Sequence, residues 1–383
     1  MRISLLTPYL PLITQGLVMS LLAISPIAAC AQPVKYDAII GTAAAGYEGI
    51  PSYPTITAAL AAAPDNRRSP FVVYLAEGRY REKVLVNKSS IHLIGAGPDK
   101  SIISFGDYAG MPAAGTGEPM GTFSTATLTV EARDFKAENL TIENSFDFLA
   151  TDALPKGHKE KISGTQAVAL KTGVDSDRAA FRNVRLSGFQ DTLFVQGGRS
   201  YFVESIIEGN VDFIFGAGQA LFERSDIITR PRATQRKTVG YITAPSTDIS
   251  NRFGLVFLNC RLLKAPGVPP GSSPLGRPWH PTTTFPDGRY ADPSAIGASI
   301  FINTYMDDHI PEDGWASMRG TSRDGSKSTV FTPESARFFE FGSYGPGAAI
   351  NPKRRQLSER AAAEYTSANI LAGWQPVFLT SGR

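Results

Sequence analysis

Two aspartates stand inside otherwise apolar, strand-like runs near the middle of this 383-residue chain. Asp191 lies in the run Gly188–Phe194 and Asp212 in the run Gly209–Gly216, so 21 residues separate the two carboxyl groups. If 21 residues make one coil of a repeating structure, the two side chains lie on adjacent strands, roughly 4.8 Å apart at the backbone. Two carboxylates at that distance cannot both ionise at low cost, so the pKa of one of them should rise. The pair therefore predicts a general acid/base beside a carboxylate nucleophile.

Two glutamines follow nearly the same spacing. Gln190 directly precedes Asp191, and Gln166 lies 24 residues before Gln190, which is again about one coil. An amide cannot titrate, but it can donate a hydrogen bond to a developing oxyanion. Further along, Arg277 supplies a guanidinium that can hold a carboxylate in a fixed fork, and Trp279 supplies an indole suited to packing on a sugar face. Each residue alone is more often a turn former or a core side chain, but the combination indicates a site.

A repeat of about 22 residues between Leu128 and Met306 indicates how these residues are brought together. Related hexamers recur at steps of 44, 22, 20, 34 and 44 residues, and we interpret each 44-residue step as two coils. The 34-residue step indicates an inserted loop near Arg230–Tyr241. The hexamers begin at Asn139, Asn183, Ser205, Ser225, Asn259 and Asn303. A coil of about three short strands takes just over twenty residues and buries its inward side chains only by stacking on the next coil, so the pattern predicts an all-β parallel β-helix.

Both ends of such a solenoid need caps, because an open coil exposes unpaired strand edges. Tyr53–Pro64 predicts a capping helix at the N-terminal end, and Ser358–Ser367 predicts a helix near the other end. Along the interior, we expect Ile142, Leu186 and Ile207 to stack as a ladder.

The first 31 residues have the composition of an export signal. A single basic residue, Arg2, precedes a long apolar stretch that ends in small residues. Ala29-Cys30-Ala31 offers a cleavage site, and Cys30 alternatively resembles the lipidated residue of a bacterial lipoprotein. We expect residues 1–31 to be a signal peptide and residues 32–383 to form a single solenoid domain. The protein would then be secreted or periplasmic, or anchored to the outer membrane through Cys30.

The composition gives little support to several other classes of protein. A formal net charge of only +3 gives no reason to expect a nucleic-acid partner. Two cysteines are too few for a disulfide-rich scaffold or a cysteine-based zinc site. The four histidines include no H-x-H or H-x-x-x-H pair, so we expect no metal and assign His280 and Asp307-Asp308-His309 to structural or solvent roles.

At the residues named above, the sequence resembles the pectinesterases (pectin methylesterases, carbohydrate esterase family 8), and it looks closer to bacterial than to plant members. The matching motifs are Tyr53–Ile56, Ala76–Val84, Asn139–Asn144, Gln166–Leu170, the two aspartate runs, Leu275–Trp279, Met306–Ile310 and Gly373-Trp374. The resemblance implies a right-handed parallel β-helix that works without a cofactor. It also implies hydrolysis of the C6 methyl ester of galacturonate residues in pectin, with release of methanol.

The resemblance also implies roles for individual residues. Asp212 corresponds to the nucleophile, Asp191 to the proton donor that later acts as base, and Gln190 to an oxyanion donor. The residues implied to contact or orient the substrate or the nucleophile are Thr122, Gln166, Phe215, Arg277 and Trp279. One departure from the family is Lys171, where Tyr or Arg is usual, and the insert 230–237 is a second feature that could reshape the cleft.

Other functions remain open at this level. A pectate lyase or polygalacturonase would need calcium-binding acid clusters with a basic catalytic residue, or three aspartates, and we identify neither. A serine esterase is disfavoured because the chain has no G-x-S-x-G motif. An esterase or thioesterase of the same family with a different substrate, or a pectin-binding envelope lipoprotein, remains possible. The expected partner is methylesterified pectin; we expect a monomer, with no protein or nucleic-acid partner.

Overall fold

The computed structural model describes residues 34–41, 47–65, 67 and 69–380, and the expected export signal lies outside these residues. From Lys35 onward the described chain forms one compact unit. None of its described helices is long and apolar enough to cross a membrane.

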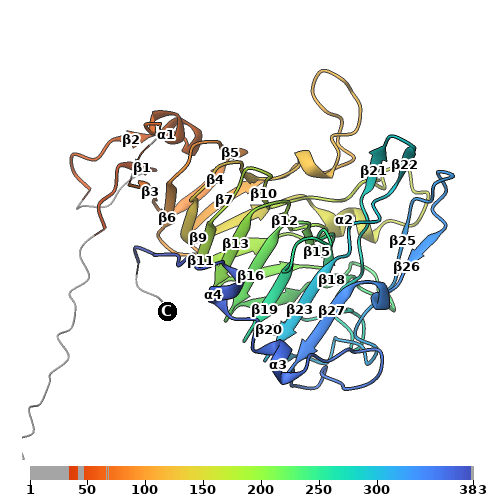
Figure 1. Cartoon of the computed structure of the whole chain (residues 1–383). Helices are drawn as coiled ribbons and strands as arrows, with labels where there is room; N and C mark the ends of the chain where they lie inside the picture. The colour runs from red at the N-terminus through yellow and green to blue at the C-terminus, as the bar shows by residue number, and fades with distance from the viewer. Residues whose placement is uncertain (1–33, 42–46, 66, 68, 381–383) are drawn as a thin grey trace, which may run out of the picture. The chain divides into compact units, whose positions relative to one another are not determined.

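This unit is built mainly from short parallel strands, each paired with the corresponding strand of the next coil (Figure 1). The larger sheet consists of β1 (Ala38–Ile40), β2 (Ser52–Tyr53), β3 (Phe71–Leu75), β4 (Gly78–Arg81), β6 (Ile91–Gly95), β7 (Ser101–Phe105), β9 (Lys136–Asn144), β11 (Ala179–Ser187), β13 (Arg199–Val203), β14 (Ile206–Gly209), β16 (Gln219–Glu223), β17 (Asp226–Thr229), β19 (Leu255–Leu258), β20 (Arg261–Lys264), β23 (Ala298–Ile302), β24 (Tyr305–Met306) and β27 (Arg337–Phe341). The smaller sheet consists of β5 (Val84–Val86), β8 (Leu128–Val130), β10 (Leu170–Thr172), β12 (Leu193–Val195), β15 (Val211–Gly216) and β18 (Tyr241–Pro245).

The remaining elements are two antiparallel hairpins and a few short helices. The hairpins are β21 (Thr282–Phe285) with β22 (Gly288–Ala291), and β25 (Met318–Gly320) with β26 (Thr329–Phe331). The helices are α1 (Ile56–Ala62), α2 (Phe148–Ala153), α3 (Glu359–Ala362), α4 (Ser367–Ile370) and the 3₁₀ turns η1 (Thr122–Ser124) and η2 (Pro333–Ser335).

The predicted interior ladder is confirmed, and with it the parallel β-helix. Ile142 pairs with Leu186, and Leu186 pairs with Ile207. The same column continues through Ile227, Leu262 and Met306. All six side chains are fully buried, so each coil completes the core of its neighbour as the repeat requires.

The 44-residue steps are single coils, and our interpretation of each as two coils was wrong. β9 and β11 are hydrogen-bonded neighbours although Ile142 and Leu186 stand 44 residues apart. A loop that contains α2 leaves the stack between them. The step from Leu262 to Met306 is also one coil, with the hairpin β21–β22 inserted. An inserted loop increases the number of residues in a coil but adds no further layer of strands, so a 44-residue step can still be one coil.

Asparagines begin several hexamers because the chain turns there in a left-handed conformation. Asn139, Asn183, Asn259 and Asn303 all have φ between +49° and +57°, a region that asparagine tolerates better than most residues. The Asn183 side chain donates from Nδ2 to Oδ1 of Asn139 at 2.7 Å. An asparagine in the sequence therefore marks the corner between two strands of a coil, because the backbone at that corner must adopt a positive φ.

A second column in the interior consists of stacked phenylalanine rings, which the sequence analysis did not single out. Neighbouring ring centroids lie 4.5–5.7 Å apart, within the range of favourable aromatic contacts. The members are Phe135, Phe181, Phe202, Phe222, Phe257 and Phe301.

The N-terminal cap forms as expected, but the C-terminal helix does not. Helix α1 buries Ile56 and Leu60 in the main core, and Thr55 accepts a hydrogen bond from its first turn. In place of one helix over Ser358–Ser367 there are two four-residue helices, because Ser358 and Thr366 each cap a new start. Helix α4 packs against outward-facing side chains of the larger sheet rather than against an open end.

Replacing Leu186 by alanine is expected to lower the free energy of unfolding by roughly 2–5 kcal/mol, because the ladder cannot close over the cavity. Arg185→Ala on the same strand is the control, since that side chain is about one-third exposed and its ion pairs should contribute less than about 1 kcal/mol. Urea denaturation measures both values. Equal losses for the two variants would contradict the assignment of the inward face.

Candidate active site

The structure places Asp191 and Asp212 at equivalent positions on adjacent coils. Leu193 pairs with Ile214, and each aspartate lies two residues before its member of that pair. The Asp191 amide donates to the carbonyl oxygen of Val211 at 3.0 Å. The one-coil separation derived from the sequence is therefore present, and the hydrogen-bonded strands fix it.

Both aspartates have an unusual backbone conformation. Their φ angles are +63° for Asp191 and +49° for Asp212, a left-handed region that is uncommon for residues other than glycine, asparagine and aspartate. In addition, the pairing of β15 with β18 shifts register between Val211 and Ile214. A positive φ also occurs at ordinary corners of the coils, but a register shift of this kind is over-represented next to active sites.

The environments of the two carboxyl groups differ although both side chains are buried. Burial, followed by the nearby charge of Asp212, raises the pKa of Asp191 well above its ordinary value, and the positive charge of Arg277 opposes this effect. Asp212 instead forms a two-point ion pair with Arg277, whose Nε donates to Oδ1 at 2.8 Å and whose Nη2 donates to Oδ2. One carboxyl group is thus suited to carry a proton, while the other is held in place by a guanidinium.

Arg277 is itself held by neighbours that the sequence analysis missed. Its guanidinium carbon lies 4.0 Å from the centre of the Tyr241 ring, a cation–π contact. Its backbone amide donates to the carbonyl oxygen of Thr243 at 3.0 Å. Tyr241 pairs with Val211 of the preceding coil, but the inserted loop between the two residues hides this register in the sequence.

All eight residues proposed from the sequence line one cleft. They are Thr122, Gln166, Gln190, Asp191, Asp212, Phe215, Arg277 and Trp279. Three further lining residues were missed, namely Phe123, Ala244 and Met318. Phe123 belongs to η1 and Met318 to the hairpin β25–β26, so neither lies on a strand whose periodicity could reveal it.

An aromatic wall runs along this cleft. Phe123 stacks on Phe194 with ring centroids 5.0 Å apart, and Phe194 stacks on Phe215 at 4.6 Å. Trp279 meets Phe215 edge to face at 5.7 Å, while Phe123 leaves half of its surface exposed. Phe194 lies 21 residues before Phe215, so the repeat could have identified it.

The two departures noted in the sequence lie in different places. Lys171 pairs in register with Phe194, so it lies beside the aromatic wall, where its Nζ forms an ion pair with Glu131 at 3.1 Å. The insert 230–237 instead lines a separate cavity next to the cleft. There Arg232 forms an ion pair with Asp152 of α2 at 2.6 Å.

The remaining histidine motifs do not join the cleft. His280 stacks on Phe331 and shares a 2.7 Å hydrogen bond with the carbonyl oxygen of Asp292. His309 is fully buried, and burial lowers its pKa to about 4. Within the described ranges, no group of three His, Cys, Asp or Glu side chains could hold a metal ion.

Comparison with known proteins identifies similar sequences and structures over nearly the whole chain. The sequence model of the family described as Pectinesterase matches residues 42–373. Pectinesterase A of Dickeya dadantii (strain 3937) is 43% identical over 371 residues, which cover 95% of this chain and 98% of the relative. The solved structure of a pectin methylesterase from Erwinia chrysanthemi superposes with a TM-score of 0.85 at 44% identity, covering 90% of this chain and 99% of that one. The pectin methylesterase of Yersinia enterocolitica gives a TM-score of 0.81 at 48% identity, covering 84% and 99%.

Proposed function

Because the chain belongs to the pectinesterase family, whose members hydrolyse the methyl esters of pectin, we propose that it removes C6 methyl esters from galacturonate residues with Asp212 as nucleophile and Asp191 as acid and base. The observation that carries the assignment is the contrast between the two carboxyl groups. Asp212 is held by both arms of the Arg277 guanidinium, and Asp191 has a raised pKa beside it.

In the first step, a carboxylate oxygen of Asp212 attacks the carbonyl carbon of the ester. The carbonyl electrons move onto oxygen, and the amide groups of Gln190 and Gln166 donate hydrogen bonds to this oxyanion. When the carbonyl re-forms, the bond to the methoxy oxygen breaks and Asp191 gives its proton to that oxygen. Methanol leaves, and the galacturonoyl group remains joined to Asp212 as an anhydride.

In the second step, Asp191 acts as the base because it has lost its proton. It accepts a proton from a water molecule, whose oxygen attacks the galacturonoyl carbonyl carbon. Collapse of this second tetrahedral intermediate breaks the bond to Asp212 and releases the galacturonate carboxyl group. Asp191 is then protonated and Asp212 ionised, as they were before the reaction.

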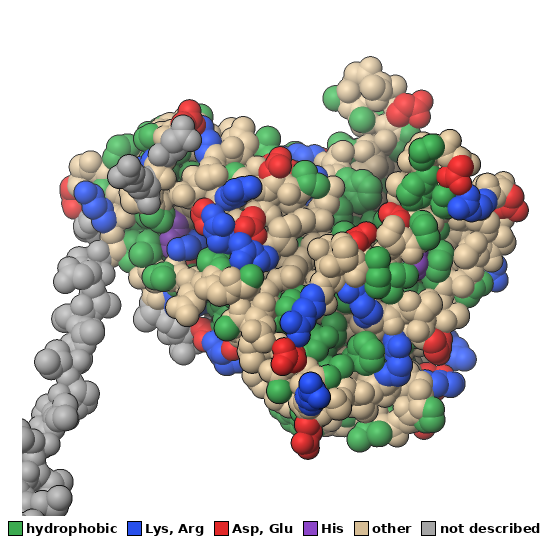
Figure 2. Space-filling view, in the orientation of Figure 1, with side chains coloured by type: hydrophobic (Ala, Val, Ile, Leu, Met, Phe, Trp, Pro, Cys, Tyr) green, Lys and Arg blue, Asp and Glu red, His purple; other side chains and the backbone are tan. Residues whose placement is uncertain are grey.

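The substrate would lie along the aromatic wall. Trp279 and the half-exposed Phe123 offer flat apolar surfaces for sugar faces, and Thr122 offers a hydroxyl group on the same cleft. The buried Phe215 packs against Trp279 and supports it. Figure 2 shows basic and acidic side chains interspersed over one face of the protein, which agrees with the small net charge of +3. We therefore assign pectin binding to the shape of the cleft and to aromatic contacts rather than to a large positive electrostatic potential. We propose that the protein acts as a monomer.

Incubation with highly esterified pectin is expected to release methanol without shortening the polysaccharide, and to do so equally with and without a metal chelator. Methanol assay and size-exclusion chromatography of the pectin measure the two results, with a small acyl ester assayed in parallel. Loss of activity on chelation, or cleavage of the polysaccharide, would instead indicate a lyase or a polygalacturonase. Faster hydrolysis of the small ester would indicate a different substrate.

We also propose export for this protein, because residues 1–31 combine a basic start, an apolar stretch and a small-residue end. The mature protein would begin at Gln32, or at a lipidated Cys30. Intact-mass spectrometry of protein made in its native host distinguishes the two forms, and a chain that keeps residues 1–29 would contradict both.

A further inference from the structure

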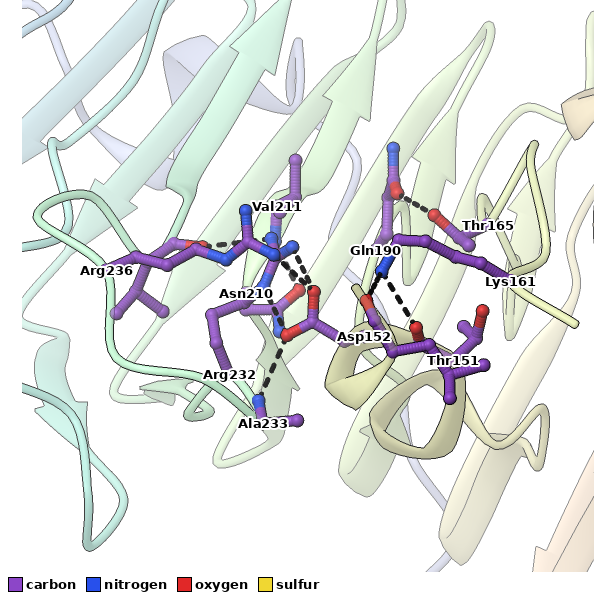
Figure 3. Close-up of polar contacts among 12 residues, drawn as sticks. Thr151, Asp152, Lys161, Thr165, Gln190, Asn210, Val211, Arg232, Ala233 and Arg236 are labelled. Carbon is purple, nitrogen blue, oxygen red and sulfur yellow. Dashed lines mark hydrogen bonds and ion pairs between the residues drawn. The ribbon is translucent and has the colours of Figure 1, made fainter. Parts of the chain in front are cut away.

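The side chain of Gln190 is held from outside the catalytic cleft. The hydroxyl group of Thr165 donates to Oε1 of Gln190 at 2.7 Å (Figure 3). A threonine hydroxyl has one proton to donate, and a glutamine amide presents an oxygen acceptor on one side and an NH₂ donor on the other. A bond that holds the oxygen therefore decides which way the NH₂ group points.

The other candidate oxyanion donor has no such bond. Within the described part of the chain, Oε1 of Gln166 is buried and has no hydrogen-bond partner. Both amides line the cleft, but only that of Gln190 has its oxygen engaged by a neighbouring side chain. The two glutamines thus differ in whether a neighbouring side chain fixes the orientation of the amide group.

The loop that carries Thr165 is anchored on α2. The Lys161 ammonium donates to the carbonyl oxygens of Thr151 and Leu154, and the Ile162 amide donates to Oγ1 of Thr151 at 2.8 Å. At the other end of the loop, the Gly110 amide donates to the carbonyl oxygen of Gly164 at 2.8 Å. Thr165 follows directly, so its position is restrained from both sides.

Helix α2 is in turn tied to the coil that follows the catalytic strands. The Asp152 carboxylate accepts from Nε and Nη2 of Arg232 at 3.0 and 2.6 Å, and from Arg236 at 2.9 Å. It also accepts from the Ala233 amide at 3.0 Å. Asp152 is nearly fully buried, and Figure 3 shows this cluster beside the Lys161 and Thr165 contacts. The contacts that hold Thr165, and through it Gln190, therefore connect loops from two different coils.

We propose that Thr165 is a positioning residue that keeps the NH₂ group of Gln190 directed at the oxyanion. If the amide turned over, its carbonyl oxygen would face the negative charge that develops on the substrate, and the interaction would become repulsive. Thr165 excludes this orientation before the substrate arrives, so it acts on the transition state rather than on substrate affinity. The proposal rests on the proposed role of Gln190 as an oxyanion donor.

The test is a double-mutant cycle between Thr165 and Gln190, with methanol release from pectin as the assay. Thr165→Val, which keeps the shape and removes the hydroxyl, is expected to lower kcat about 3- to 10-fold, the factor that corresponds to one net hydrogen bond, with KM nearly unchanged. Thr165→Ser should restore most of kcat, because it keeps the hydroxyl. In a Gln190→Ala background, Thr165→Val should have no further effect. Thr57→Val is the matched control, since Thr57 makes a side-chain hydrogen bond of 2.8 Å to Glu82 at helix α1.

The possible outcomes distinguish a failure of the positioning role of Thr165 from a failure of the oxyanion role of Gln190. A fall in kcat of equal size in the wild-type and Gln190→Ala backgrounds would overturn the positioning role and indicate a general loosening of the loop. A change in KM alone, or failure of Thr165→Ser to restore kcat, would overturn it as well. If Gln190→Ala itself keeps full activity, the proposed oxyanion role of Gln190 fails first and the role of Thr165 fails with it. Thermal unfolding of each variant confirms that the compared proteins are folded.

Discussion

Asp191→Asn is expected to give a stoichiometric burst of leaving group from an activated aryl ester that fits the cleft, whereas Asp212→Asn gives none. An aryl oxide leaves without a proton, so the acylation step survives in part when the acid is missing. Deacylation then stalls, because the same residue supplies the base. Asp212→Asn removes the proposed nucleophile, so we expect no acyl-enzyme. On pectin, whose methoxide is a poor leaving group, loss of the acid should lower turnover by about 10²–10⁴-fold.

Stopped-flow absorbance measures the burst, and intact-mass spectrometry should find the acyl adduct on the Asp191→Asn protein alone. A burst with Asp212→Asn instead would reverse the assignment of nucleophile and acid. Methanol release from pectin at the wild-type rate by either variant would show that the pair is not catalytic.

Arg277→Ala is expected to lower kcat on pectin by about 10²- to 10³-fold, because Asp212 loses the fork that holds both of its oxygens in place. The pH profile should change as well. In the proposed mechanism Asp191 is protonated for the first step, so activity should fall as the pH rises through its pKa. The charge of Arg277 lowers that pKa, so removing the charge raises it further. The alkaline limb of kcat/KM should therefore move to higher pH.

Arg277→Lys separates the two effects, because lysine keeps the charge and loses the two-point geometry. We expect the alkaline limb to stay near its wild-type position while kcat remains well below the wild-type value. An alkaline limb that does not move in Arg277→Ala would contradict the proposed state of Asp191. Full activity of Arg277→Lys would show that charge alone is sufficient at this position.

The periodic part of the molecule could be predicted from the sequence because its physical cause is itself periodic. Ile142, Leu186 and Ile207 repeat because each coil must bury the next, and Asp191 and Asp212 interrupt that repeat at the same phase. The spacing alone predicts a carboxyl pair. The roles of the two members, by contrast, came from the resemblance to a family.

Phe194 follows the repeat and could have been found from it, but the other parts of the cleft that escaped prediction lie where the repeat gives little information. Phe123 and Met318 reach the cleft from inserted loops, and the register of Tyr241 is hidden by an insertion. The loops also misled the coil count, since 44 residues suggested two coils where the pairing of Leu262 with Met306 shows one. The single helix predicted over 358–367 ends at Ala362, and Thr366 caps the start of a separate helix.

The pairing of Leu193 with Ile214 makes the backbone distance between Asp191 and Asp212 a property of the main chain, roughly the 4.8 Å repeat of any hydrogen-bonded ladder. Side-chain substitutions can raise or lower the melting temperature of the stacked coils, but they change the distance between neighbouring strands very little. A variant weakened in its core should therefore keep its full specific activity as long as the coils remain together, and then lose it all at once. For each such variant, the heat-inactivation curve should superimpose on the melting curve. Loss of catalytic activity would then report the loss of stacking between coils.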